Sequence, residues 1–312
     1  MGNRLAGRVA IVTGAGRGIG RGEALLLAAE GAAVVVNDLG GAPDGTGQST
    51  SPADDVVEEI KKAGGKAVAN YDNVANMEGG ERIVKTALDN FGRLDILVNN
   101  AGILRDRMVF NMTEEEWDAV IAVHLKGHFS TIKPASQIFR QQRSGRIVNT
   151  GSSSGLGNMG QANYAAAKEG IVGLTRTVAR DIGRYGATCN AIRPGAATRL
   201  TLSPEMEEAR RRAEAAGVRR GGGGMPSMPP EAIAPLVVYL CTDAAQNVNG
   251  RDFAVSGRSI GLYTIPTVEK TIYAPGEIWT LDELDEIFPR TIGAGLRNEF
   301  GPREQPAAAA SS

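Results

Sequence analysis

The sequence lacks the features of secreted, metal-binding and membrane-spanning chains. Its two cysteines, Cys189 and Cys241, form no metal-ligand spacing and suit a reducing compartment. Residues 1–8 contain no apolar core of a signal peptide, and the chain has no run of about 18 apolar residues. We therefore expect a cytoplasmic protein without a membrane span.

An excess of charge of either sign is also missing. The 34 lysines and arginines balance the 35 aspartates and glutamates, which leaves a net charge of −1. Binding to nucleic acid needs a basic surface, so we expect no nucleic-acid partner. The composition that is present is globular: 312 residues with 42% hydrophobic side chains suffice for one large α/β domain or two small ones.

Short apolar runs alternate with amphipathic stretches along most of the chain. The expected strands cover residues 9–13, 33–37, 66–70, 95–99, 146–150, 188–192 and 251–256. The expected helices cover residues 18–30, 53–62, 83–91, 113–142, 161–185 and 230–242. This alternation predicts the α/β class, with a single Rossmann-type, doubly wound parallel sheet and helices on both faces.

The alternation breaks after the sixth expected strand. Residues 196–228 contain four consecutive glycines at 221–224, and we expect them to form a mobile substrate lid. The domain should extend over residues 1–260, with a C-terminal extension over 261–312. A short helix is expected at 281–287, and the Ala/Ser/Pro-rich last residues should be disordered.

A glycine-rich turn joins the first expected strand to the first helix. The residues Thr13-Gly14-Ala15-Gly16-Arg17-Gly18-Ile19-Gly20 have the spacing Gly-x3-Gly-x-Gly. Glycines let the backbone approach a pyrophosphate, which is then held at the positive end of the helix. The turn predicts a dinucleotide site, with these residues as ligands: Gly14, Arg17, Gly18, Ile19 and Gly20.

Asp38 follows the second expected strand, where a carboxylate can accept hydrogen bonds from the adenosine ribose. The same carboxylate repels a 2′-phosphate, so Asp38 favours NAD over NADP. Arg17 would favour NADP instead, because its guanidinium could bind that phosphate. A surface arginine is the simpler interpretation of Arg17, and NAD is therefore the expected cofactor.

Tyr164 and Lys168 lie four residues apart in an expected helix and therefore share a face. A phenol titrates at about pH 10, and a cation at about 5 Å supplies on the order of 3 kcal/mol toward lowering that pKa. An oxidised nicotinamide ring, which is also positive, could supply the rest. The pair predicts an activated phenol, and the simpler alternative is an amphipathic helix with a surface lysine.

Together these motifs resemble the short-chain dehydrogenase/reductase family. The resemblance covers about residues 5–260 and includes the glycine turn, Asn99-Asn100-Ala101-Gly102, the Ser/Tyr/Lys set and Arg193-Pro194-Gly195. Four stretches are more particular: they resemble the (3R)-hydroxyacyl-CoA dehydrogenase part of peroxisomal multifunctional enzyme type 2 and its bacterial relatives. These stretches are residues 34–41, 65–72, 99–107 and 123–127.

The resemblance implies roles for individual residues. Tyr164 would be the general acid/base, Lys168 would lower its pKa and hold the nicotinamide ribose, and Ser152 would hydrogen-bond the substrate oxygen. Members of the family place the serine one position earlier, where this chain has Gly151, so Ser153 and Ser154 are lesser candidates. The implied cofactor contacts are Asn99, Ala101 and Gly102 along the cleft, Asn73 and Val74 at adenine, and Pro194, Gly195 and Thr198 at the nicotinamide.

His124 stands where many family members have an asparagine that anchors a water for the lysine. We expect His124 to bond a water or a backbone carbonyl. His124 and His128 are spaced as a metal pair, but no third ligand is evident and no metal is expected.

Other features are ambiguous. The arginines at 210–212 and 219–220 could meet the phosphates of a CoA or carrier-protein substrate, or they could be a solvated helix face. Met206, Met225 and Met228 could line an apolar mouth or simply pack. Trp279 is expected to anchor the extension on the body or on a neighbouring subunit, with an active-site role in a partner chain as the alternative.

The expected reaction is NAD-linked oxidation of a secondary alcohol to a ketone, with a 3-hydroxyacyl-CoA as the favoured substrate. A ketoreductase or alcohol dehydrogenase for small, cyclic or aromatic substrates is the enzymatic alternative. A regulator that senses NAD without turnover is the alternative from another class, and the Tyr164/Lys168 pair argues against it. By family likeness we expect a homodimer or homotetramer that pairs through helices 113–142 and 161–185.

Overall fold

The computed structural model describes residues 2–196 and 228–301. The chain divides into two compact units, Met1–Tyr263 and Thr264–Ser312. Most of the expected lid over 196–228, with its arginines, Met206 and Met225, lies outside the described residues.

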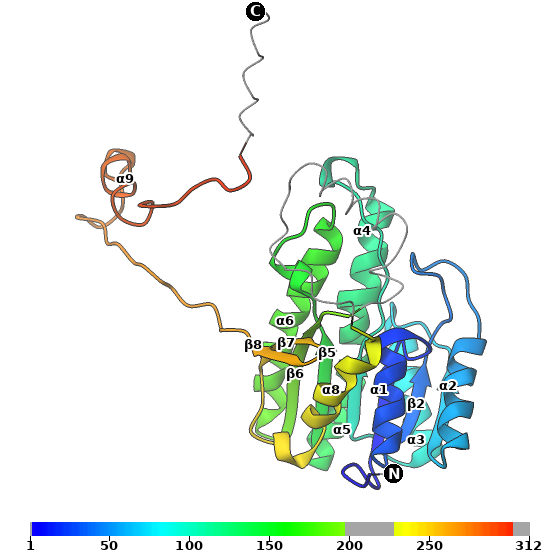
Figure 1. Cartoon of the computed structure of the whole chain (residues 1–312). Helices are drawn as coiled ribbons and strands as arrows, with labels where there is room; N and C mark the ends of the chain where they lie inside the picture. The colour runs from blue at the N-terminus through cyan, green and yellow to red at the C-terminus, as the bar shows by residue number, and fades with distance from the viewer. Residues whose placement is uncertain (1, 197–227, 302–312) are drawn as a thin grey trace, which may run out of the picture. The chain divides into compact units, whose positions relative to one another are not determined.

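A single mostly parallel sheet forms the centre of the larger unit (Figure 1). In the described residues it has eight strands in the order β3-β2-β1-β4-β5-β6-β7-β8. The strands are β1 (Val9–Thr13), β2 (Ala33–Asn37), β3 (Lys66–Asn70), β4 (Ile96–Asn99), β5 (Gly145–Thr150), β6 (Ala187–Pro194), β7 (Asp252–Ser256) and β8 (Ser259–Leu262). The predicted doubly wound α/β class is confirmed. The sequence did not predict β8, which pairs antiparallel with β7.

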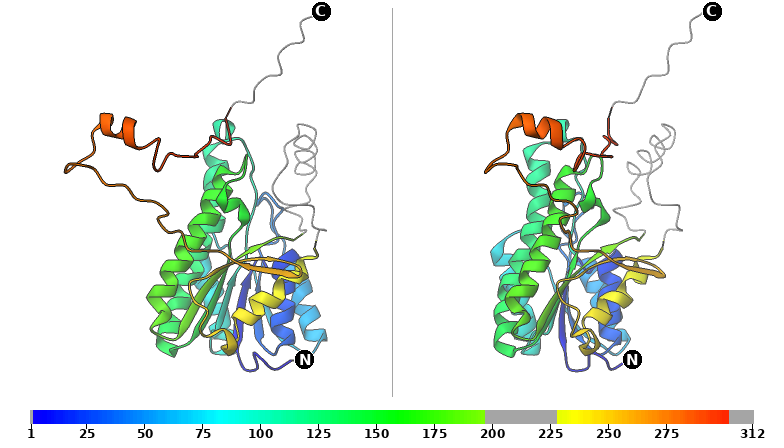
Figure 2. Two further views of the ribbon diagram at one scale, coloured as in Figure 1. Left: turned by 60° about the vertical axis from the view of Figure 1, so that its left-hand side comes forward. Right: turned by 90° about the vertical axis from the view of Figure 1, so that its left-hand side faces the viewer.

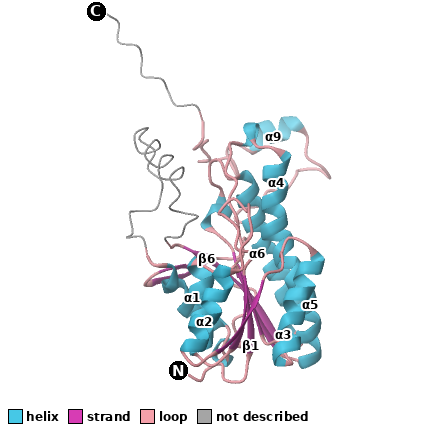
Figure 3. Ribbon diagram, turned by 90° about the vertical axis from the view of Figure 1, so that its right-hand side faces the viewer, coloured by secondary structure: helices cyan, strands magenta, loops and turns pink. Residues whose placement is uncertain are grey.

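Helices cover both faces of this sheet (Figures 2 and 3). One layer contains α1 (Gly18–Ala29), α2 (Ser51–Lys62) and α8 (Ala234–Leu240), and the other contains α3 (Met77–Phe91), α5 (Gly127–Gln142) and α6 (Ala162–Gly183). Neighbouring residues of β1 pack against different helix layers: Val12 belongs to the core beneath the first layer and Ile11 to the core beneath the second layer. Because strand side chains alternate between faces, runs of valine and isoleucine supply both cores.

The helix expected at 113–142 is interrupted. Thr113 and Glu116 form the predicted capping box at the start of α4 (Glu114–Ile121). A π-helical turn, η2 (Ala122–Lys126), then separates α4 from α5. Such turns accommodate one extra residue and are frequent at functional sites. Here the turn contains the buried side chain of His124.

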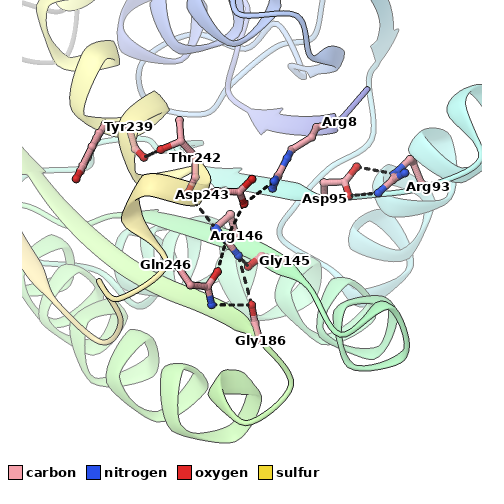
Figure 4. A network of polar contacts seen from close by, with 10 residues as sticks. All are labelled: Arg8, Arg93, Asp95, Gly145, Arg146, Gly186, Tyr239, Thr242, Asp243 and Gln246. Carbon is pink, nitrogen blue, oxygen red and sulfur yellow. Dashed lines mark hydrogen bonds and ion pairs between the residues drawn. The ribbon is translucent and has the colours of Figure 1, made fainter. Parts of the chain in front are cut away.

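The amino ends of the strands are tied together by a buried arginine (Figure 4). Arg146, the second residue of β5, is 1% exposed. Its guanidinium donates to Asp243 at 3.3 Å, to the Gln246 side chain and to the Thr242 carbonyl. Arg8 donates to the same Asp243 oxygen at 2.6 Å. This network stabilises the end of the sheet opposite the strand ends that carry the glycine turn and Ser152.

The smaller unit contains one short helix among its described residues, α9 (Leu281–Ile287). Thr280 and Glu283 form a capping box that begins it, and none of its residues is buried. Across both described ranges, no helix is long and apolar enough to cross a membrane. Both cysteines are unpaired and buried in the larger unit.

Candidate active site

A cleft of about 700 Å³ lies at the carboxyl ends of the strands. It opens between β1 and β4, where the strand order reverses, which is the usual position of a ligand site in open α/β sheets. The expected residues that line it are Gly14, Arg17, Gly18, Ile19, Asp38, Asn73, Val74, Ala101, Gly102, His124, Ser152, Tyr164, Lys168 and Pro194.

The glycine turn is shaped by close backbone contacts. Gly14 has φ +64°, and a Cβ there would lie 2.7 Å from the Cα of Ala101. A Cβ on Gly20 would lie 2.4 Å from the carbonyl oxygen of Gly14. Larger residues at these positions would clash with the backbone of Ala101 or of Gly14 and distort the turn. The first turn of α1 holds no acidic side chain. The N–H groups at the start of α1 can donate hydrogen bonds to an anion.

Asn100 braces this turn, and its role was missed in the sequence. Its side-chain amide donates to the carbonyl oxygens of Thr13 and Gly14, both at 3.1 Å. In return, the Thr13 hydroxyl accepts from the backbone N–H groups of Asn100 and Ala101. The neighbouring Asn99, which was expected in the cleft, is 1% exposed and does not line it. Its side-chain amide instead donates to the Asn149 side chain and accepts from the Thr131 hydroxyl.

Asp38 presents a fixed carboxylate to the cleft. One oxygen accepts from the N–H of Gly16 at 2.8 Å and the other accepts from the N–H of Gly40 at 2.7 Å. These bonds hold the side chain beside the glycine turn, where the adenosine ribose is expected. Asn73 and Val74 line the same cleft.

Tyr164 and Lys168 extend from one face of α6 into the cleft. The ammonium nitrogen of Lys168 donates to the Thr150 carbonyl at 2.6 Å and lies 5.5 Å from the centroid of the Tyr164 ring. The Ser152 side chain lies close enough to Tyr164 to lower the pKa of the phenol. Its Oγ also accepts from the N–H of Ser154 at 3.1 Å. The structure therefore brings the three expected residues together, and Gly151 packs against the carbonyl of Ile192 instead.

Burial shifts the Tyr164 phenol and the Lys168 ammonium toward their neutral forms. It raises the pKa of Tyr164 to about 12, although the nearby Ser152 side chain opposes the shift. It lowers the pKa of Lys168 to about 7. The pKa of the phenol is therefore raised in this structure, whereas the expectation was that Lys168 and a positive nicotinamide ring together lower it. The largest cause is the burial of the Tyr164 side chain itself, which disfavours the charged phenolate.

His124 lies beneath Tyr164 in the π-helical turn. The two rings pack edge to face, with centroids 5.1 Å apart. Its Nε2 lies 2.8 Å from the Ile103 carbonyl, and burial, followed by the charge of Lys168, holds the His124 pKa well below its usual range. Gly102 leaves room for the ring, since a Cβ there would lie 2.4 Å from Cε1. In the described part of the chain, no group of three histidine, cysteine or acidic side chains could hold a metal.

Some expected residues lie elsewhere. Gly20 supports the turn from below without lining the cleft. Gly195 donates its N–H to Val255 at 2.8 Å and also lies outside the lining. Thr198 is outside the described residues, and the half-buried Trp279 belongs to the smaller unit.

A polar chain beside Tyr164 was not expected from the sequence. Asn158 donates to Gln161, and Gln161 donates to the Asp106 carboxylate, each at 2.7 Å. Asn158 and Gln161 line the cleft, and the negative charge of Asp106 contributes to the raised pKa of Tyr164. The only sequence signal was their proximity to the Tyr164 and Asn99–Arg107 motifs.

Comparisons with known proteins agree with this geometry. Residues 8–210 match the short chain dehydrogenase family. The chain is 42% identical over 318 residues to hydroxyacyl-CoA dehydrogenase ChsB1 of Mycobacterium tuberculosis, which covers 96% of this chain and 90% of that protein. It is 47% identical over 259 residues to peroxisomal multifunctional enzyme type 2 of Mus musculus, covering 83% of this chain and 33% of that enzyme. The crystal structure of a short chain dehydrogenase from Mycobacterium avium matches with a TM-score of 0.78 and 44% identity, over 93% of this chain and 95% of that one.

The fold and the cleft define an oxidoreductase of the Rossmann type. The chain belongs to the short-chain dehydrogenase/reductase family. It is an enzyme that acts on CH–OH groups, and the family implies NAD(P) as the cofactor.

Proposed function

We propose that this enzyme oxidises a secondary alcohol to a ketone, reversibly and with NAD, and that its substrate is a 3-hydroxyacyl-CoA. The observation that carries the reaction is the meeting of Ser152, Tyr164 and Lys168 in one cleft with the glycine turn. The names of the relatives support the substrate, because a hydroxyacyl-CoA dehydrogenase matches 96% of the chain.

The residues of the cleft fit a dinucleotide. The start of α1 would hold the pyrophosphate, Asp38 the adenosine ribose, and Lys168 the nicotinamide ribose. When bound, oxidised NAD supplies a hydride acceptor and one positive charge. We therefore expect the pKa of Tyr164 to fall on cofactor binding, because an added cation favours the phenolate.

The chain's own residues handle the proton. Tyr164 exchanges it with the substrate oxygen. The Ser152 Oγ accepts from the Ser154 N–H, which leaves the serine proton available for donation to the same substrate oxygen. Buried His124 packs against the Tyr164 ring and helps to fix its plane.

Exposed apolar side chains beside the cleft support a long aliphatic substrate. Met108, Val109 and Phe110 are exposed on one segment, and Leu156 and Met159 on another. The two segments are joined by a backbone bond from residue 107 to residue 160. An apolar surface of this kind suits an acyl chain better than a small alcohol.

The first test replaces Tyr164 with Phe. Turnover should fall by about 10²–10⁴-fold, because the general acid/base is lost while the ring remains. NAD affinity, measured by calorimetry, should change little. Retained turnover would show that another group moves the proton.

The substrate is tested with a panel under identical conditions. 3-Hydroxyacyl-CoA thioesters of both configurations are compared with cyclic, aromatic and small secondary alcohols. We expect the highest kcat/KM for one thioester enantiomer. A preference for a simple alcohol would favour the alternative alcohol dehydrogenase or ketoreductase. Bound NAD without turnover of any compound would instead favour a sensor.

A homodimer or homotetramer in the cytoplasm completes the proposal. The exposed Phe129 of α5 supports pairing through α5 and α6. Light scattering of the purified chain measures the assembly directly.

A further inference from the structure

Arg193 is a buried arginine of β6 that contacts the candidate active site from below. Its side chain is 2% exposed. The guanidinium donates to Asp252 at 2.8 Å, to Glu169 at 2.9 Å and to the backbone carbonyl of Ser152 at 2.9 Å. Its fourth neighbour is Tyr263, whose ring centroid lies 4.7 Å away.

These partners come from three other parts of the larger unit. Asp252 begins β7, Glu169 follows Lys168 on α6, and Ser152 leads into the turn after β5. A planar guanidinium with a rigid fork of donors can hold all three at once, which a single ammonium cannot. The two carboxylates offset the cost of burying the arginine's charge.

Gly155 leaves space for this arrangement. A Cβ on Gly155 would lie 2.8 Å from the Glu169 carboxylate and 3.2 Å from the Arg193 guanidinium. The serine turn can therefore approach Arg193 and Glu169 this closely because residue 155 is a glycine.

We propose that Arg193 is a positioning residue, which fixes the Ser152 carbonyl so that the serine hydroxyl faces the substrate oxygen. The inference rests on the proposed role of Ser152. With the carbonyl held by Arg193 and the Oγ held by the Ser154 N–H, both ends of the serine are fixed. The same guanidinium aligns this turn with the helix that carries Tyr164 and Lys168, through Glu169.

The test is a double-mutant cycle between Arg193→Met and Ser152→Ala. Arg193→Met should lower kcat by about 10- to 100-fold, as expected for a small displacement of a reacting group. KM and NAD affinity should change little. In the Ser152→Ala background, Arg193→Met should cause no further loss of kcat, because the group that it positions is already absent.

Arg146→Met is the matched control, since it removes an equally buried arginine from the other end of the neighbouring strand (Figure 4). It should lower the melting temperature and leave kcat unchanged. If Arg193→Met does not fold, the cycle uses Arg193→Lys instead, since lysine keeps the positive charge but lacks the planar set of N–H donors. The positioning role would be overturned if the kcat losses of Arg193→Met and Ser152→Ala multiply in the double variant. A loss of kcat in Arg146→Met equal to that in Arg193→Met would also overturn it. Full turnover in Ser152→Ala alone would instead refute the proposed role of Ser152, and this inference with it.

Discussion

At the residue scale, Asp38 provides the sharpest test of cofactor choice. Its two oxygens are held by the N–H groups of Gly16 and Gly40, so the carboxylate cannot easily turn away from a 2′-phosphate. Asp38→Ala should therefore reduce the preference for NAD over NADP by at least about tenfold, because a close charge repulsion is removed.

The measurement is the ratio of kcat/KM values for the two cofactors. Asp44→Ala is the control, because Asp44 is an exposed carboxylate of the same loop that bonds Thr46. An unchanged ratio in Asp38→Ala would remove the basis for preferring NAD.

The residue scale also shows where a local argument about charge is insufficient. Spacing alone places Lys168 close to Tyr164, and the structure gives 5.5 Å between the ammonium nitrogen and the ring centroid. Burial is nevertheless the largest effect on both pKa values, and it acts in opposite directions on an acid and a cation. The depth of a side chain depends on the whole fold and cannot be read from spacing.

At the element scale, α1 carries a buried acid that the reaction does not use. Glu23 is 0% exposed, and neither carboxylate oxygen has a hydrogen-bond partner in the described residues. Burial raises its pKa from 4.5 to about 8. The folded chain therefore keeps a proton that the unfolded chain releases between these values, so stability falls as pH rises through this window.

Glu23→Gln should remove this pH dependence. The variant should gain stability over the natural chain as pH rises from 5 to 8, by up to the order of 5 kcal/mol. Chemical denaturation at several pH values measures the difference. Glu81→Gln, an exposed change on α3, is the control and should follow the natural chain. A Glu23→Gln curve parallel to that of the natural chain would show that Glu23 is already ionised in the fold.

Element types were predicted well where the periodicity is local. The capping box at Thr113 and Glu116 was recognised because its residues are three positions apart. The π-helical turn at Ala122–Lys126, which contains the buried His124, was not recognised, because one extra residue hardly disturbs a helical pattern. Strand β8 was missed because it forms only by pairing with β7.

At the scale of the whole molecule, the two units differ in how they are stabilised. The buried hydrophobic residues of the described chain end at Val255, so the larger unit contains its own core. Truncation after Tyr263 should leave a cooperatively folded chain whose melting temperature changes by only a few degrees. Thermal unfolding followed by circular dichroism measures this.

The cut must retain Tyr263, which packs on Arg193. Truncation before Tyr263 should cost more stability than truncation after it. Loss of cooperative unfolding in the longer fragment would mean that residues 264–312 contribute to the core in solution.

The sequence by itself determined the strand and helix order, the glycine turn and the Tyr164/Lys168 pair. Each of these depends on residues that are close in the chain, and local spacing encodes them. Only the tertiary structure decided that Asn100 rather than Asn99 braces the turn, and that Arg193 holds Ser152. These contacts join residues 41 to 87 positions apart, so they exist only once packing of the sheet has brought the strand ends together.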